Sequence, residues 1–216
     1  MEEYEIIFNQ ARNAMGFVPN TLLGMQKKPN IMGAFGMFMA NIRGFSSSNT
    51  TPLMGIRLML KNMRLMIQAK KERDQELPVY LKDLLGHVAS NAAGCRYCQA
   101  HTAYTAYGNG VSVEKLQNVW EFQTSDLFSA KEKAALSFAL AAASVPNQVT
   151  PEHHTALKQF FTESQIVEIM ATVAVFGFLN RWNDSMATEL EDTPLQFAEQ
   201  HLSATWEPGK HKSMSG

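Results

Sequence analysis

Apolar residues recur at helical spacing along most of this chain, and helix-capping residues stand between the runs. Alternating apolar and polar runs long enough to form a strand are absent from the sequence. Ala, Leu, Met, Gln and Lys are frequent, and all of them favour helices. The pattern therefore predicts an all-α protein of about nine or ten helices.

The expected helices are separated by breakers and by residues that open or end a helix. In the first part of the chain the predicted helices cover residues 2–15, 21–26, 29–42 and 53–72, with a Ser-rich loop at 44–51. Further on they cover 78–92, 95–107, 112–122, 129–144, a helix opened by Thr150-Pro151, 162–186 and 195–202. We expect a single all-helical domain over 1–216, made of an N-terminal helical arm (about 1–75), a redox core (about 76–205) and a loose tail (206–216).

Composition and charge exclude several classes of protein. Of the 216 residues, 45% are hydrophobic and 18% are charged, so the chain is not mainly disordered. The formal net charge of −1 gives no electrostatic reason to expect binding to nucleic acid or to an anionic membrane. The longest apolar stretch, Ile166 to Leu179, contains Glu168 and is too short to cross a bilayer. The acidic start Met1-Glu2-Glu3 does not resemble a signal peptide, and we expect a cytoplasmic protein.

The two cysteines, Cys95 and Cys98, form one Cys-x-x-Cys pair. Gly94 is expected to end one helix, which places Cys95 at the cap and Cys98 in the first turn of the next. Unpaired backbone N–H groups at a helix N-terminus stabilise a thiolate, which is the reactive form of cysteine. The pair lies one turn apart, so an oxidised cysteine can condense with its neighbour to a disulfide.

Three further residues complete a candidate thiol redox site. His101 follows Cys98 by three residues and falls near both cysteines on the helix surface. Asp83 and His87 lie one turn apart on the preceding helix, where a carboxylate can orient an imidazole. If the two helices pack together, Asp83, His87 and His101 supply a proton relay to the thiols. We expect His153, His154 and His211 at the surface, and Asn180, Arg181 and Asp184 in a polar network near the site.

These residues resemble those of the carboxymuconolactone decarboxylase superfamily, in its alkylhydroperoxidase D-like, peroxidase-related branch. That branch has an acidic residue, eleven intervening residues, and then Cys-x-x-Cys followed by a histidine. Here the corresponding residues are Asp83, Cys95, Cys98 and His101. The flanking segments 16–20, 180–184 and 186–188 fit as well. The family usually has Glu in place of Asp83, and its histidine often stands at the position of Thr102.

The resemblance implies an alkylhydroperoxidase D-like helical bundle that assembles into homo-oligomers (dimer, trimer or hexamer). It also implies a peroxidase: Cys98 attacks a hydroperoxide, Cys95 resolves the product to a disulfide, and Asp83 and His101 move protons. The reaction needs no cofactor and no metal. An external dithiol or a reductase partner returns the pair to its reduced state.

Other functions stay open at the level of sequence. A lyase or isomerase of the same superfamily would use His101 or His87 as acid and base and would not need the cysteines. A non-enzymatic redox sensor, or an oligomer that holds zinc through Cys95, Cys98, His101 and Asp83, is a third function. A general disulfide oxidoreductase would act on protein disulfides without peroxide.

Overall fold

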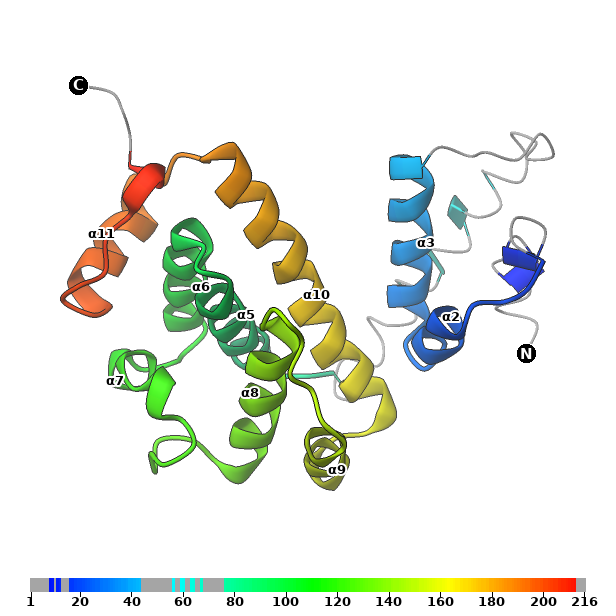
Figure 1. Ribbon diagram of the computed structural model, residues 1–216, viewed down its shortest axis with the longest axis horizontal. Coiled ribbons are helices and arrows are strands. Elements are labelled where there is room, and N and C mark those ends of the chain that lie inside the picture. The colour runs from blue at the N-terminus through cyan, green and yellow to red at the C-terminus, as the bar shows by residue number, and fades with distance from the viewer. Residues whose placement is uncertain are drawn as a thin grey trace. The chain divides into compact units, whose positions relative to one another are not determined.

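The computed structural model describes residues 8–9, 11–12, 16–43, 56, 59–60, 63–64, 67 and 76–212 (Figure 1). Within these ranges the chain forms nine α-helices and two short 3-10 helices, and it contains no strand. The prediction of an all-α fold is therefore confirmed. The expected loop at 44–51, and most of the expected helices at 2–15 and 53–72, lie outside the described residues.

The chain divides into two compact units, one of residues 1–76 and 163–168 and the other of residues 77–162 and 169–216. The first unit contains α2 (Asn20–Met25) and α3 (Pro29–Arg43). Phe8, Ala11, Leu22 and Met32 form its buried apolar cluster. The ammonium group of Lys28 lies 3.4 Å from a carboxylate oxygen of Glu168 and 3.6 Å from one of Glu76, and these acidic residues satisfy the nearly buried cation.

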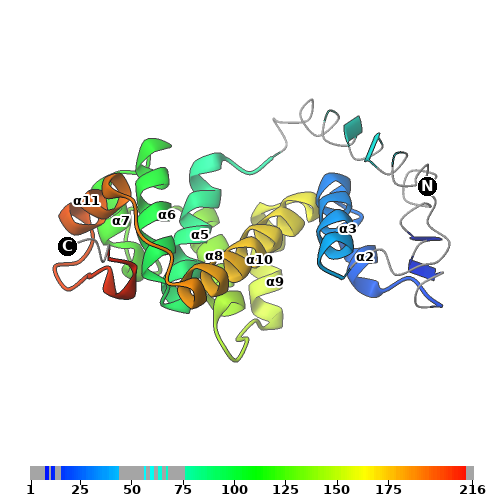
Figure 2. The ribbon, with the colours of Figure 1, turned by 90° about the horizontal axis from the view of Figure 1, so that it is seen from above.

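The second unit is built around a pair of antiparallel helices, α5 (Val79–Ala93) and α6 (Arg96–Gly108), which lie side by side in both views (Figures 1 and 2). Gly94 ends α5 in the left-handed conformation with φ 74°, as glycine at this position allows. The Gly94 and Cys95 N–H groups donate to carbonyls of the last turn of α5, so the chain reverses at once into α6. The tight turn predicted at Gly94 is confirmed.

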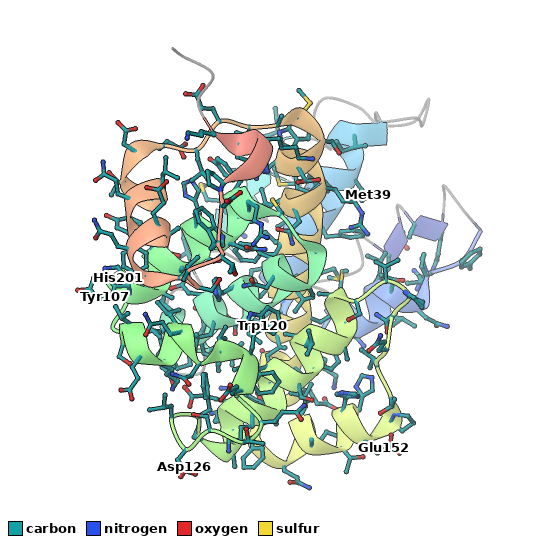
Figure 3. The ribbon with its side chains drawn as sticks, turned by 60° about the vertical axis from the view of Figure 1, so that its left-hand side comes forward. Met39, Tyr107, Trp120, Asp126, Glu152 and His201 are labelled. Atoms are coloured by element: carbon teal, nitrogen blue, oxygen red, sulfur yellow. The ribbon has the colours of Figure 1, made fainter. Side chains whose placement is uncertain are left out.

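Four more helices surround this pair. Helix α8 (Ala130–Ala143) packs on α5 and α9 (Pro151–Phe160) packs on α8, while α11 (Asp192–His201) packs on α6. Figure 3 shows the contact at the far end of α6, where Tyr107 and His201 lie against each other with ring centroids 6.5 Å apart. Helix α10 (Glu163–Met186) gives residues 163–168 to the first unit and the rest to the second.

Two predicted elements differ from the structure. Instead of one helix over 112–122, α7 (Val113–Gln117) is followed by η2 (Val119–Glu121), because Asn118 leaves the helical region with φ −95° and ψ 14°. The last predicted helix begins three residues earlier, at Asp192. Among the described residues, no helix is both long enough and apolar enough to cross a membrane.

The C-terminal segment corrects a further expectation. Trp206 packs with Ala100, Leu190 and Ala198, and its indole N–H donates to the side-chain oxygen of Gln99 at 3.0 Å. The 3-10 helix η3 (Gly209–His211) follows, and the side chain of His211 is buried. The predictions of a loose tail and of a surface His211 are therefore wrong for residues 206–212, because these residues pack against α6 and the end of α10. Residues 213–216 of the expected tail lie outside the described residues.

Candidate functional site

The two cysteines lie at the N-terminus of α6, where the short turn at Gly94 places them. Cys95 is the N-cap residue and Cys98 is in the first turn. Both are free thiols, with exposed fractions of 0% and 3%. They are not bonded to each other in this structure, which describes the reduced pair.

The two thiols differ in their electrostatic surroundings. The neighbouring thiol of Cys98 lowers the pKa of Cys95, although burial works in the opposite direction. The backbone of Cys98 at the helix N-terminus and the nearby imidazole of His211 lower it further. The neighbouring Cys95 and burial raise the pKa of Cys98. Of the two thiols, Cys95 is therefore the more readily deprotonated.

Helix α10 brings a polar group to the second cysteine. The side-chain amide of Asn183, which is nearly buried, donates to the sulfur of Cys98 at 3.5 Å. One turn earlier, the amide of Asn180 donates to the carbonyl of Ala89 on α5 at 3.4 Å. The expected polar network of α10 thus includes Asn180, and it reaches the thiols through Asn183.

A histidine and an aspartate from the end of the chain lie beside Cys95. The sulfur of Cys95, a carboxylate oxygen of Asp184 and a ring nitrogen of His211 all lie within 4.8 Å of one another. The Nδ1 of His211 bonds the carbonyl oxygen of Thr188 at 2.8 Å, which fixes the ring. Its Nε2 lies 3.5 Å from Oδ1 of Asp184, and the other carboxylate oxygen of Asp184 accepts from Lys210 at 2.8 Å. A backbone hydrogen bond from Leu190 to the carbonyl of His211 holds the segment in place.

His87, predicted to belong to the proton relay, is buried behind the cysteine helix. Its Nδ1 bonds the hydroxyl of Thr102 at 3.0 Å, and Thr102 in turn donates to the carbonyl of Cys98 at 2.6 Å. Burial lowers the pKa of His87 to about 4, against a smaller opposing effect of a hydrogen bond with the backbone of Gln99. His87 is therefore a neutral, packed side chain at neutral pH. It touches the cysteine helix at Thr102, the position where the related family often has its histidine.

The shortest polar contact of His101 is with Glu191, not with a thiol. Its Nε2 lies 2.7 Å from a carboxylate oxygen of Glu191, and the hydroxyl of Tyr97 donates to the other oxygen at 3.1 Å. The rings of Tyr97 and His101 lie 4.4 Å apart. The partner Glu191 comes just before α11 and is ninety residues away in sequence, so local spacing gives no indication of it.

Asp83 lies at the opposite end of the helix pair from the cysteines. Its two carboxylate oxygens accept from Asn109 at 2.7 Å and from Thr105 at 3.3 Å, both near the end of α6. Burial raises the pKa of Asp83, and the two hydrogen bonds partly offset this rise. Because α5 and α6 are antiparallel, Asp83 at the start of α5 cannot lie beside Cys95 at the start of α6.

The structure therefore brings Cys95 and Cys98 together and leaves Asp83, His87 and His101 bonded to other partners. The groups that do face the thiols are Asn183, Asp184 and His211. Asn183 belongs to a motif noted in the sequence, and Asp184 to the expected network. His211 had no sequence indication, since it follows Cys95 by more than a hundred residues.

A large open cavity lies next to this site, with a volume of about 1200 Å³. Helices α5, α8 and α10 and the segment after α8 line it, mostly with Ala, Met, Phe and Trp side chains. Asp184 belongs both to its wall and to the group around Cys95. The cavity thus offers a mainly apolar approach that ends near the thiols.

Comparison with known proteins agrees with this architecture. The model of the carboxymuconolactone decarboxylase family matches residues 59–141, which include both cysteines. The crystal structure of the ligand-free debrominase Bmp8 is 32% identical, with a TM-score of 0.53, and the match covers 88% of this chain and 87% of that one. A Cys-to-Ala variant of Bmp8 in complex with 2,3,4-tribromopyrrole is 30% identical, with a TM-score of 0.55, over 92% and 90% of the two chains. A search of curated proteins finds no match.

The chain belongs to the carboxymuconolactone decarboxylase family, as the resemblance in its sequence predicted. Its all-helical fold is that of the family, and a relative with enzymatic activity matches it along nearly its whole length.

Proposed function

We propose that this protein is a thiol-dependent reductase in which Cys95 and Cys98 together supply two electrons to a substrate. The observation that carries the proposal is the geometry of the pair: two free, buried thiols one turn apart at the N-terminus of one helix. Such a pair is converted to a disulfide when one sulfur takes an electrophilic atom from a substrate and the other displaces that atom.

The first substrate class we propose is a hydroperoxide. The thiolate attacks the outer oxygen of the peroxide, the O–O bond breaks, and the alcohol leaves after taking up a proton. The second thiol then attacks the resulting sulfenic acid, and water leaves as the disulfide forms. The balance is one hydroperoxide and two thiols to one alcohol, one water and one disulfide. An external dithiol or reductase partner must then reduce the disulfide.

The order of attack is proposed from the positions of the two thiols on the helix. Family resemblance assigns the attack to Cys98 and resolution to Cys95. The N-cap position of Cys95 and its lowered pKa beside Cys98 favour a thiolate at Cys95 instead. We therefore propose that Cys95 attacks and Cys98 resolves, an order that single serine variants distinguish.

A second candidate is reductive debromination, which the likeness to Bmp8 favours. In this reaction the thiolate takes bromine from carbon, the carbon takes up a proton, and the second thiol displaces bromide to form the disulfide. The balance is one C–Br compound and two thiols to one C–H compound, bromide, a proton and the disulfide. The same two cysteines serve both reactions, and the apolar cavity suits an aromatic bromide or an organic hydroperoxide.

Thiol loss measured against substrate consumed tests both candidates. Reduced protein is mixed separately with cumene hydroperoxide, hydrogen peroxide and 2,3,4-tribromopyrrole, and free thiols, bromide and alcohol are counted. We expect two thiols lost per substrate consumed. Cys95→Ser should abolish the reaction, whereas Cys98→Ser should stop at a sulfenic acid that dimedone traps.

The outcome of each arm is decisive. Turnover with peroxide alone makes the protein a peroxidase, and bromide release alone makes it a debrominase. Loss of the reaction in Cys98→Ser, together with a trapped sulfenic acid in Cys95→Ser, would reverse the proposed order. If none of the substrates oxidises the thiols within minutes, the reductase proposal fails, and the acid–base lyase becomes the function to test.

A further inference from the structure

The imidazole of His211 is a buried polar group with an unsatisfied ring nitrogen. Its side chain is 1% exposed, and its Nε2 makes no hydrogen bond among the described residues, although Oδ1 of Asp184 lies 3.5 Å away. A buried polar atom without a partner is costly, by about 1–3 kcal/mol, so native structures usually satisfy it. This Nε2 points toward the sulfur of Cys95 and the carboxylate of Asp184, which are both good metal ligands.

We propose that Cys95, Asp184 and His211 form a binding site for a divalent metal ion of the zinc class. The three ligand atoms lie within 4.8 Å of one another. A tetrahedral zinc site, with bonds of about 2.0–2.3 Å, separates its ligands by roughly 3.4–3.8 Å. Movements of about 1 Å or less would bring the side chains into that geometry.

Two of the three ligands, His211 and Asp184, are held by a second contact at an atom other than the one that would bind the metal. The Nδ1 of His211 bonds the carbonyl of Thr188, which places the lone pair of a neutral ring on Nε2. Lys210 occupies one carboxylate oxygen of Asp184 and leaves the other facing His211. Histidines bound to metals usually have such a partner on the other ring nitrogen, and it raises their basicity.

Ligand type and charge indicate which ions fit. One thiolate, one imidazole and one carboxylate together suit zinc or cobalt and are poorly suited to calcium or magnesium, which prefer oxygen ligands. A thiolate and a carboxylate carry two negative charges, which a divalent cation neutralises. Asp184 is half-exposed and lines the open cavity, so an ion can reach the site from solvent.

This site differs from the zinc site that the sequence alone allows, made of Cys95, Cys98, His101 and Asp83. His101 is paired with Glu191, and Asp83 is bonded to Asn109 at the other end of α6. Only Cys95 is common to the two sets, so variants of the remaining residues distinguish them.

Metal binding would have a direct consequence for the thiol pair. An ion bound to the sulfur of Cys95 occupies the lone pair that would attack a substrate, and it holds this sulfur away from disulfide formation. Zinc would therefore protect the reduced pair from oxidation and inhibit any reaction of Cys95. The site itself does not depend on the proposed reductase activity.

The test is zinc affinity of the full chain in its reduced form, measured by competition with a chromogenic chelator in the absence of any oxidant. We expect one zinc per chain, and an affinity lowered at least tenfold in His211→Ala and in Asp184→Asn. His101→Ala is the matched control on the cysteine helix and should bind within twofold of the original protein. Cobalt substitution should give a thiolate-to-cobalt charge-transfer band that Cys95→Ser removes and Cys98→Ser retains.

Several results would overturn this assignment. They are the absence of zinc binding, undiminished affinity in Asp184→Asn, or a loss in His101→Ala as large as that in the His211 variant. Because His211 is buried, its variant is checked for folding by circular dichroism, and the half-exposed Asp184 supplies a variant with less risk of unfolding. The zinc measurement uses no substrate, so a failure to bind zinc would not affect the reductase proposal. Failure of the reductase tests would likewise not affect the proposed zinc site.

Discussion

At the scale of single residues, His87 gives the protein a specific sensitivity to acid. The side chain is fully buried, and its pKa is lowered from 6.5 to about 4. In the unfolded chain the ring takes up a proton near pH 6.5, whereas in the folded chain it resists protonation until about pH 4. Stability from this group is therefore fully present above pH 6.5 and is lost as the pH falls toward 4.

Urea unfolding between these two pH values tests this expectation. The shift corresponds to a loss of about 3 kcal/mol in the free energy of unfolding on going from pH 6.5 to pH 4. His87→Gln should lower stability at neutral pH and flatten the dependence in this window. Equal slopes for the variant and the original protein would show that His87 is not the group responsible.

Residue spacing predicted neighbours on one helix and missed those from distant parts of the chain. Cys95 and Cys98 were placed correctly because one turn of helix and the glycine before it decide their positions. Asp83 and His101 have equally regular spacing, yet each bonds a partner that spacing does not reveal. The burial of His211 depends on how the last segment folds back, which no local pattern in a polar stretch indicates.

At the scale of elements, the close approach of α5 and α10 depends on Gly86. A Cβ added at this position would collide with the ring of Phe176. Gly86→Ala should lower the free energy of unfolding by about 1–3 kcal/mol, since a half-buried ring can turn only part of the way. The matched control is Gly177→Ala on α10, where a Cβ meets only the Arg181 side chain at 3.6 Å.

Chemical denaturation of both variants measures the difference. Gly177→Ala should be as stable as the original protein or more stable by up to about 1 kcal/mol, because alanine has a higher helix propensity than glycine. If the two substitutions have the same effect, the two helices do not meet at Gly86 as described.

The residue that follows the last residue of α10 has a strained backbone. Ala187 has φ 48°, in the left-handed region that costs a non-glycine residue about 1 kcal/mol or more. The N–H of Thr188 then bonds the carbonyl of Asn183 at 3.0 Å and closes the helix end. Ala187→Gly should raise the melting temperature, with a gain of about 1 kcal/mol.

A glycine inside α10 is expected to have the opposite effect on stability. Ala174→Gly, at an exposed position inside this helix, should lower the free energy of unfolding by about 1 kcal/mol. Calorimetry of the two variants compares them directly, and a loss of stability in both would show that the bend at Ala187 is not under strain.

At the scale of the whole molecule, the apolar stripe of α10 is expected to be an interface between copies. We define the α10 stripe as four exposed residues spaced three or four apart on the helix: Val175, Phe178, Trp182 and Met186. Such a stripe is unusual on the surface of a monomer. Together with the oligomers implied by the family resemblance, it leads us to expect a homo-oligomer with a contact along the stripe, three of whose residues also line the open cavity.

Light scattering coupled to size-exclusion chromatography tests this expectation. Trp182→Glu should lower the molar mass of the particle by at least half, because a charge in an apolar interface is costly. Trp120→Glu is the matched control, since Trp120 is 53% exposed and Trp182 is 57% exposed. A monomeric original protein, or equal dissociation in both variants, would contradict the expectation.

Fold class was the most predictable property at this scale, because helical periodicity extends over nearly every segment of the chain. The start of the second unit, between Glu76 and Leu77, also lies close to the expected start of the core. Contacts made by the last residues were not predictable, since their polar composition is typical of loose ends.

Because residues 206–211 are among the last to be synthesised, the thiol site is completed only at the end of translation. Gln99 and its partner Trp206 are 107 residues apart in the chain, and His211 follows later still. At translation rates of roughly 5–20 residues per second, the cysteines leave the ribosome several seconds before these residues exist. During that interval the nascent thiol pair lacks His211, which lies beside Cys95 in the folded chain. Newly made chains should therefore be the population most easily damaged by oxidants in a stressed cell.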